Sequence, residues 1–235
     1  MDPTANATYD LISTLVAELD PIFPAEFPFW HMGGDEVQFD CWRLSTSGYI
    51  DKFMQNHGIV AGDYSSLQGY FEQRVIDVVR ALPSKKRTVL WEESTNRASA
   101  TSGLPKDAVV QLFHEDNGNA SVLDATVSGG WQVFYTTRDW YFDHGKTLTD
   151  GSWEYDYGLE PFANSTLPEA QLDAAVLGSE SCMWSPHFDS TNFLTEAFPR
   201  AAAVAERLWS ARGVRVGLGR IVAVYYRSFT PYQIR

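Results

Sequence analysis

Two adjacent carboxylates, Asp35 and Glu36, are the residues whose type and spacing are best suited to chemistry. They follow a short apolar run, Phe29 to Met32, through two glycines, Gly33 and Gly34. The run is typical of a short buried strand, and the glycines permit backbone shapes and close approaches that a side chain forbids. Alpha/beta proteins place their chemistry at the carboxyl ends of such strands. The alternative is a tight turn that leads into a helix, with Asp35 as a solvated cap.

The same arrangement recurs further along the chain. Four more apolar runs end in acids or aromatic residues: Thr88–Trp91 with Trp91 and Glu92, Ala108–Phe113 with Phe113 and Glu115, Gln132–Thr136 with Trp140, Tyr141 and Asp143, and Leu172–Leu177 with Glu180 and Trp184. Because the carboxyl ends of parallel strands meet at one edge, five such ends in series predict a single concave site on the rim of an α/β barrel.

Helices are expected between these strands, from the spacing of apolar residues and from capping residues. The expected helices are Thr8–Phe23 with Leu11, Ile12, Leu15, Val16 and Leu19 on its apolar face, Gly48–Gly58, Tyr64–Leu82 after an Asp63 cap, Ala120–Ser128 and Phe198–Trp209. A long loop is expected over Gly145–Leu167 because turn residues occur throughout it. The alternation of strands with helices or loops predicts a parallel α/β fold.

Composition limits the classes of partner. The 235 residues are 44% hydrophobic and 14% aromatic, which indicates a folded globular protein. The length is close to the ~250 residues of one (β/α)8 barrel. Eight tryptophans and eleven tyrosines suit flat ligands with apolar faces, such as sugars. The net charge of −12 disfavours nucleic acid and anionic membranes as partners. No apolar run approaches the length of a membrane span.

Cysteines and glycosylation sequons bear on the compartment. Two cysteines, Cys41 and Cys182, are too few for a disulfide framework. Sequons at Asn6, Asn119 and Asn164 are a weak hint of secretion. The first residues carry neither a basic nor an apolar region of a signal peptide. Sequons without a signal fit a chain that lacks its own beginning.

Five motifs together resemble one known family. HMGGDEV, VLWEE, DWYFD, GSESCMWSPHFDSTN and PRAAAVAERLWS occur here in the order in which they occur in the family 20 glycoside hydrolases, the β-N-acetylhexosaminidases. The resemblance extends to about Arg212 and implies a (β/α)8 TIM-type barrel in which the acid pair follows the fourth strand. Strands 4 to 8 would then fall within the chain. We therefore expect a partial catalytic barrel over residues 1–212 and a divergent tail over 213–235.

The resemblance also implies a division of labour in the site. In this family the substrate's own 2-acetamido group is the nucleophile and gives an oxazolinium intermediate. Glu36 matches the general acid that protonates the leaving oxygen and then activates water, and Asp35 matches the group that orients the acetamido N–H. Tyr141 matches the tyrosine that donates to the acetamido oxygen. The positions that match substrate-binding residues are Trp91, Phe113, Trp140, Asp143 and Trp184.

Two positions, Phe113 and Pro186, depart from the family's pattern, and a third, Cys41, matches it without its partner. Phe113 stands where the family usually has another pocket tryptophan, which alters the shape of the apolar wall. Pro186 stands where many members have a glutamate that contacts the sugar hydroxyls, and a proline cannot make that contact. Cys41 resembles a family cysteine whose partner lies upstream, so we expect Cys41 to be unpaired.

The activity implied by the resemblance is release of terminal β-linked N-acetylglucosamine or N-acetylgalactosamine from glycans, glycoconjugates or chitooligosaccharides. No cofactor is implied, and no metal, because His31, His114, His144 and His187 match no standard ligand spacing. The resemblance and the sequons favour a lysosomal or extracellular location, and a homodimer is an open possibility.

Two alternatives stand beside this reading. The first is an inactive partial barrel or a sugar-binding remnant, since five strands alone leave two open sheet edges. The second is a conventional retaining glycosidase with Asp35 as nucleophile. It is disfavoured because that mechanism needs two carboxyls about 5 Å apart across the glycosidic bond, which adjacent residues rarely provide.

Overall fold

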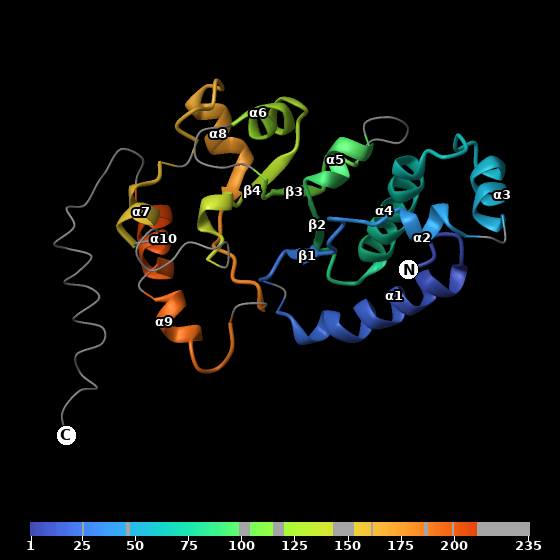
Figure 1. The fold of residues 1–235 in the computed structure, drawn as a ribbon, viewed down its shortest axis with the longest axis horizontal. Coiled ribbons are helices and arrows are strands. Elements are labelled where there is room, and N and C mark those ends of the chain that lie inside the picture. Colours follow the sequence, from blue (N-terminus) through green and yellow to red (C-terminus); the bar gives the residue numbers. More distant parts are fainter. Residues whose placement is uncertain are drawn as a thin grey trace. The chain divides into compact units, whose positions relative to one another are not determined.

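The computed structural model in Figure 1 describes residues 1–24, 26–45, 48–98, 104–114, 120–142, 153–160, 162–185, 188–198 and 200–210, with the side chains of 96–98 left aside. The chain divides into two compact units. Unit 1 comprises Met1–Gln111 and Thr126–Gln132, and unit 2 comprises Leu112–Ala125 and Val133–Arg235.

Parallel strands form the sheet of unit 1. They are β1 (Phe29–His31), β2 (Arg87–Trp91) and β3 (Val109–Leu112, of which the first three residues belong to this unit). β1 pairs with β2, and β2 pairs with β3, both in parallel. The predicted strands are confirmed to within a residue or so at each end. The expected burial of the first strand was wrong, because β1 is only half-buried and its His31 is exposed, whereas β3 is buried throughout.

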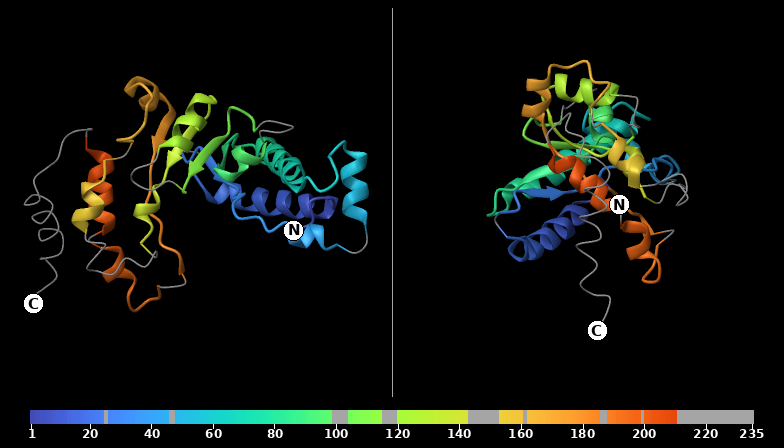
Figure 2. Two further views of the ribbon diagram at one scale, coloured as in Figure 1. Left: turned by 45° about the horizontal axis from the view of Figure 1, so that its top comes forward. Right: turned by 90° about the vertical axis from the view of Figure 1, so that its left-hand side faces the viewer.

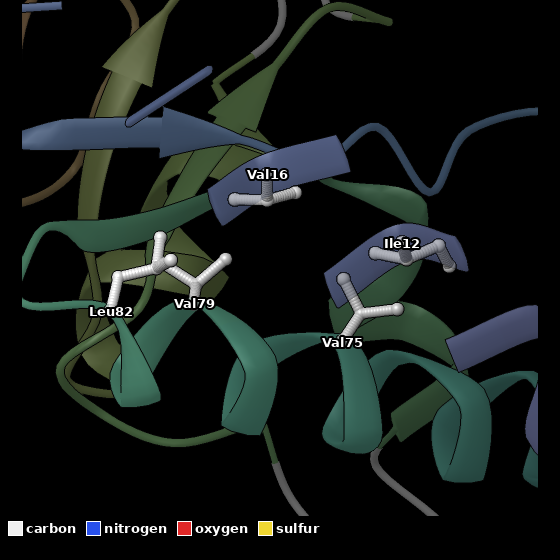
Figure 3. Packing of buried hydrophobic residues seen from close by; sticks show 5 residues of the cluster. All are labelled: Ile12, Val16, Val75, Val79 and Leu82. Carbon is white, nitrogen blue, oxygen red and sulfur yellow. The ribbon is translucent and has the colours of Figure 1, made fainter. Parts of the chain in front are cut away.

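Helices pack on this sheet and on one another. They are α1 (Asn6–Leu19), η1 (Asp20–Ile22), α2 (Asp40–Arg43), α3 (Tyr49–Asn56), α4 (Tyr64–Ala81) and α5 (Glu93–Ala98). α1 lies alongside α4 (Figures 1 and 2). Figure 3 shows the apolar side chains that fill the space between these two helices: Ile12, Val16, Val75, Val79 and Leu82.

The predicted apolar face of the first helix was wrong in part. Leu11 and Leu15 are 67% and 52% exposed, and the buried residues are Tyr9, Ile12 and Val16. The helix carries two neighbouring apolar stripes at the same spacing, and only one of them can face α4. Periodicity alone did not indicate which stripe that would be.

The predicted helix after Asp63 is confirmed as α4. The Asp63 carboxylate accepts a hydrogen bond from the Ser66 backbone N–H at 3.1 Å, which satisfies one of the donors left open at a helix start. Two polar residues, Gln68 and Glu72, lie on the buried face of this helix beside Leu67. Their contacts bear on the candidate site described below.

A buried ion pair joins η1 to the segment before β2. Lys86 Nζ lies 3.1 Å from Asp20 Oδ1, and the same oxygen accepts hydrogen bonds from Trp30 Nε1 at 3.0 Å and from Ser84 Oγ at 2.7 Å. The hydrogen bonds from Trp30 and Ser84, aided by Lys86, lower the pKa of Asp20 from its ordinary value of 3.8 to about 2. The carboxylate is therefore stabilised in its charged form by the fold.

This network predicts an acid-dependent loss of stability. Because the Asp20 pKa is lower in the folded state, its contribution is complete above the ordinary carboxyl pKa of 3.8 and is lost as the pH falls through about 2. Asp20→Asn should lower the urea midpoint of unfolding at neutral pH and flatten its dependence on pH below the ordinary carboxyl value. Asp10→Asn, on the exposed side of α1, is the control. An unchanged acid dependence in Asp20→Asn would contradict the assignment.

The parallel strands β4 (Gln132–Tyr135) and β5 (Val176–Gly178) belong to unit 2, except for Gln132, which unit 1 includes together with the end of α6 (Ser121–Ser128) from Thr126 onward. Beside β4, the Thr136 N–H donates to the carbonyl of Leu112 at 3.0 Å. The other elements are η2 (Arg138–Trp140), α7 (Trp153–Gly158), α8 (Glu169–Ala175), α9 (Phe193–Ala197) and α10 (Arg200–Trp209). α7 lies against α10 (Figure 2).

Two predictions in this region were wrong. Leu172–Leu177 was expected to be a strand, but its first four residues end helix α8 and only Val176–Gly178 is extended. Glutamate, glutamine, leucine and alanine are strong helix formers, and they dominate the sequence of α8. The expected loop over Gly145–Leu167 contains helix α7. Among the helices in the described ranges, none combines the length and apolar character that crossing a membrane requires.

Candidate active site

The acid pair follows β1 through a loop with an unusual backbone. Beyond the strand, the Met32 N–H donates to the Val89 carbonyl at 2.9 Å, and the Trp91 N–H donates to the Gly33 carbonyl at 3.0 Å. Gly33 and Gly34 then have φ angles of 75° and 101°, in a region that side chains rarely adopt. The predicted need for glycine at these two positions is confirmed.

Asp35 and Glu36 lie in this loop and not at a helix start. The next helix, α2, begins at Asp40 with Phe39 as its N-cap, so the interpretation of Asp35 as a cap is wrong. Asp35 is half-buried, and the Glu36 side chain is exposed. Glu36 has a φ of 48°, which is strained for a residue other than glycine. Its backbone N–H donates to Glu93 Oε2 at 2.9 Å, and this contact holds the strained residue in place.

The end of β2 supplies the neighbours of this loop. Trp91 is buried, and its ring centroid lies 4.9 Å from that of His31. Glu92 points into the interior and is buried, whereas Glu93 opens α5 and reaches Glu36. Neither the strand ends nor the family motifs assigned a role to Glu93. The pairing of β1 with β2 could have indicated it, because parallel neighbours bring their carboxyl ends together.

In unit 2, Trp140 and Tyr141 are tied to the segment after β5. The Cys182 N–H donates to the Trp140 carbonyl at 3.0 Å, and the Phe142 N–H donates to the Cys182 carbonyl at 2.9 Å. Tyr141 thereby forms an isolated parallel bridge with Cys182. Trp140 is fully buried, and its Nε1 donates to the Asp156 carbonyl at 3.3 Å, so its ring contributes to the core of unit 2.

The other positions that the sequence singled out differ in exposure, and two of them lie outside the described part of the chain. Phe113 is half-buried, and its ring centroid lies 3.9 Å from that of His114. Trp184 is 48% exposed. Asp143 and Pro186 lie outside the described residues. Within unit 1 the structure brings together Asp35, Glu36 and Trp91, and within unit 2 it brings together Trp140, Tyr141 and the Cys182 segment.

A buried ion pair that no sequence motif indicated holds Phe142, the residue after Tyr141, in place. Arg200 Nε lies 2.7 Å from Asp156 Oδ2, and Arg200 Nη1 donates to the Phe142 carbonyl at 3.3 Å. The guanidinium carbon also lies 4.1 Å from the centroid of the Phe142 ring. Arg200 therefore connects α10 and α7 to the Trp140–Phe142 segment.

No group of three or more histidine, cysteine, aspartate or glutamate side chains within the described ranges is arranged to hold a metal ion. Of the histidines considered above, His144 and His187 lie outside those ranges. The chemistry that these residues can perform is that of carboxylates beside aromatic rings.

One protein-family model matches most of this chain. The profile described as "Glycosyl hydrolase family 20, catalytic domain" matches residues 1–212. The chain belongs to glycosyl hydrolase family 20. The match includes the acid-pair loop, the end of β2, the Trp140–Phe142 segment and α10.

Several relatives of this family 20 chain are known from sequence. Beta-hexosaminidase subunit alpha of Mus musculus is 34% identical over 213 residues, which are 90% of this chain and 37% of that protein. Beta-hexosaminidase subunit beta of Homo sapiens is 31% identical over 216 residues, 92% of this chain and 36% of that protein. The chain thus spans little more than a third of the length of these relatives.

Two solved structures share its fold. The GH20 exo beta-N-acetylglucosaminidase from Vibrio harveyi, solved in complex with N-acetylglucosamine, aligns with a TM-score of 0.76 at 22% identity, over 98% of this chain and 35% of that one. The beta-N-acetylhexosaminidase from Bacteroides fragilis aligns with a TM-score of 0.74 at 16% identity, over 98% and 46%. Together with the parallel strand pairs, these likenesses establish an α/β fold for the family 20 chain.

Proposed function

We propose that this family 20 chain carries the acid pair of a β-N-acetylhexosaminidase, which removes terminal β-linked N-acetylglucosamine or N-acetylgalactosamine. The observation that carries the proposal is the geometry of the loop after β1. Two adjacent carboxylates follow a double glycine, and the backbone of the second is held by Glu93 Oε2 at 2.9 Å. The names of the relatives, beta-hexosaminidases, support the same activity.

In this proposal the substrate's acetamido oxygen attacks the anomeric carbon, and the bond to the leaving oxygen breaks. Glu36 gives its proton to that oxygen and then accepts one from water, which opens the oxazolinium ion with overall retention. An exposed side chain on a fixed backbone suits a group that must meet both substrate and water. Asp35 accepts a hydrogen bond from the acetamido N–H, and Tyr141 donates one to its oxygen.

We further assign the described strands to strands 4 to 8 of a (β/α)8 barrel, with residues 1–212 as the catalytic portion and 213–235 as a tail of divergent sequence. The parallel pairing and the span of the family match support this assignment. Trp91, Phe113, Trp140, Asp143 and Trp184 lie within the family match and are assigned to substrate binding; Trp140, whose ring is fully buried, would support the site indirectly from the core. The substrates are glycans, glycoconjugates or chitooligosaccharides that end in N-acetylhexosamine.

The test is hydrolysis of a nitrophenyl N-acetyl-β-glucosaminide by the purified full-chain protein. The proposal expects release of nitrophenol, retention of the β configuration in the first-formed sugar, and competitive inhibition by a thiazoline that imitates the oxazolinium ion. Binding of the thiazoline without turnover would instead support an inactive sugar-binding barrel. An inverted product would contradict substrate assistance.

We also propose a lysosomal or extracellular location, supported by the sequons and by a pI near 4.7. Asn164 lies exposed in a turn, where an oligosaccharide can be attached without disturbing the core. Protein from a eukaryotic secretory host should lose mass on treatment with an N-glycosidase, and Asn164→Gln should reduce that loss. Asn56→Gln, at an exposed asparagine without a sequon, is the control. Wild-type protein without any such loss would count against this location.

A further inference from the structure

A buried polar network lies directly beneath the acid-pair loop. Gln68 Nε2 donates to the Gly34 carbonyl at 2.9 Å and to Glu72 Oε1 at 2.6 Å. Ser94 Oγ donates to the same Glu72 oxygen at 2.9 Å. All three side chains are buried, and Glu72 is only 3% exposed. The network thus connects α4 and the first turn of α5 to the backbone of the loop.

The loop rests on this network without intervening space. A Cβ atom at Gly34 would lie 2.6 Å from Ser94 Oγ and 3.1 Å from Glu72 Oε1. Gly34 therefore allows its own backbone to approach the buried carboxylate. The next residues in the chain are Asp35 and Glu36, so a shift of the network moves the acid pair directly.

Helix α5, which carries Ser94, supports the loop at a second point. Ser94 follows Glu93, whose Oε2 accepts the Glu36 N–H. The first turn of α5 therefore supports the loop at two points. Its Ser94 binds Glu72, which lies against Gly34, and its Glu93 binds the backbone of Glu36. Two such supports hold the backbone of the loop at Gly34 and stabilise the unfavourable φ angle of Glu36.

Burying the Glu72 carboxylate costs folding free energy. An apolar residue of similar volume at position 72 would stabilise the packing of α4 equally well or better. Hydrogen bonds from Gln68 and Ser94 to one buried oxygen, Glu72 Oε1, do, however, restrict these side chains to one arrangement. Acid catalysis needs that restriction, because a displacement of about 1 Å can reduce a rate by about 100-fold.

We propose that Glu72, Gln68 and Ser94 form a positioning network that fixes the position and orientation of the loop that carries Asp35 and Glu36. The proposal rests on the function proposed above and adds residues that do not contact the substrate. The proposal predicts that a substitution in the network makes the rate of glycoside cleavage depend more strongly on the leaving group, because misplacement of Glu36 impairs proton donation first.

The experiment compares two N-acetyl-β-glucosaminides in the full-chain protein. A dinitrophenyl aglycone leaves without a proton, and a methyl aglycone needs one from Glu36. Glu72→Gln keeps the size of the side chain, and Ser94→Ala removes one donor without adding volume. Each should lower kcat/KM for the methyl glycoside by roughly 10- to 100-fold while kcat/KM for the dinitrophenyl glycoside is nearly spared. The ratio kcat/KM is compared because it reports the first step, in which the leaving group departs, and not the later attack of water that Glu36 also assists.

Gln73 offers a matched control. It lies on the same helix and donates to Asp77 Oδ1 at 3.1 Å, with the same spacing as Gln68 and Glu72, in an exposed hydrogen bond. Gln73→Ala should leave both rates unchanged. The folded fraction of every variant is measured by circular dichroism.

Each outcome has a defined meaning. Equal losses on both substrates, or no loss on either, would overturn the positioning role and leave the proposed function intact. If Glu72→Gln does not fold, Ser94→Ala decides, and if neither folds, the network is structural and the proposal is rejected. A wild-type protein that hydrolyses neither glycoside would overturn the proposed function, and the positioning role with it.

Discussion

Glu36→Gln is expected to lower kcat for a methyl N-acetyl-β-glucosaminide by roughly 100- to 10,000-fold, the usual contribution of a general acid. The amide has nearly the shape of the carboxyl group but cannot give or accept the proton. The backbone contact from the Glu36 N–H to Glu93 Oε2 does not involve the side chain, so the loop should stay in place. Steady-state kinetics at the pH optimum of the wild type measure this effect.

The control for this prediction is Glu18→Gln, at an exposed glutamate on α1. It removes the same charge from unit 1 without touching the loop. The melting temperature of Glu36→Gln should match that of the wild type, because the side chain is exposed. Ordinary activity on the methyl glycoside in Glu36→Gln would refute the role of Glu36 as the acid.

Arg200→Ala is expected to destabilise unit 2 by about 3–5 kcal/mol, the usual cost of leaving one member of a buried ion pair alone. The substitution removes the partner 2.7 Å from Asp156 Oδ2, the donor to the Phe142 carbonyl and the cation beside the Phe142 ring. Asp156 itself is fully buried, so its charge would lie in the core. Urea unfolding followed by tryptophan fluorescence measures the change in the free energy of unfolding.

A double substitution sharpens this prediction. Asp156→Leu with Arg200→Met removes both charges and should be less destabilising than Arg200→Ala alone. Arg43→Ala is the matched control, because Arg43 and Asp40 are 60% and 68% exposed and such pairs contribute about 0–1 kcal/mol. If Arg200→Ala unfolded at the wild-type urea concentration, the pair would not stabilise the segment after Tyr141.

The elements of the fold that were predicted correctly have strong local signals. Thr88–Trp91 is a compact apolar run and forms β2, and Asp63 caps α4 as its position before an apolar helix predicts. Errors arose where local signals conflict. Leu11 and Leu15 lie at proper helical spacing, but the neighbouring stripe faces α4. The run over Leu172–Leu177 is apolar enough for a strand, yet helix formers determine its first part.

The contacts that hold the candidate site were beyond sequence reasoning for a different reason. Glu36 and Glu93 are 57 residues apart, and Asp156 and Arg200 are 44 residues apart. Such pairs depend on strand register and on helix packing, which no single motif encodes. Glu72 is similar, since a glutamate on a helix is usually exposed and only the approach of Gly34 gives it a buried role.

The most direct test of the central claim is a comparison of two nitrophenyl glycosides that differ only in the acetamido group. The full-chain protein is incubated with a nitrophenyl N-acetyl-β-glucosaminide and with the corresponding nitrophenyl β-glucoside, and kcat/KM is measured for each. Substrate-assisted catalysis by the Asp35–Glu36 pair predicts turnover of the first and no detectable turnover of the second, because the second lacks the nucleophile. Comparable kcat/KM values for the two glycosides would contradict it.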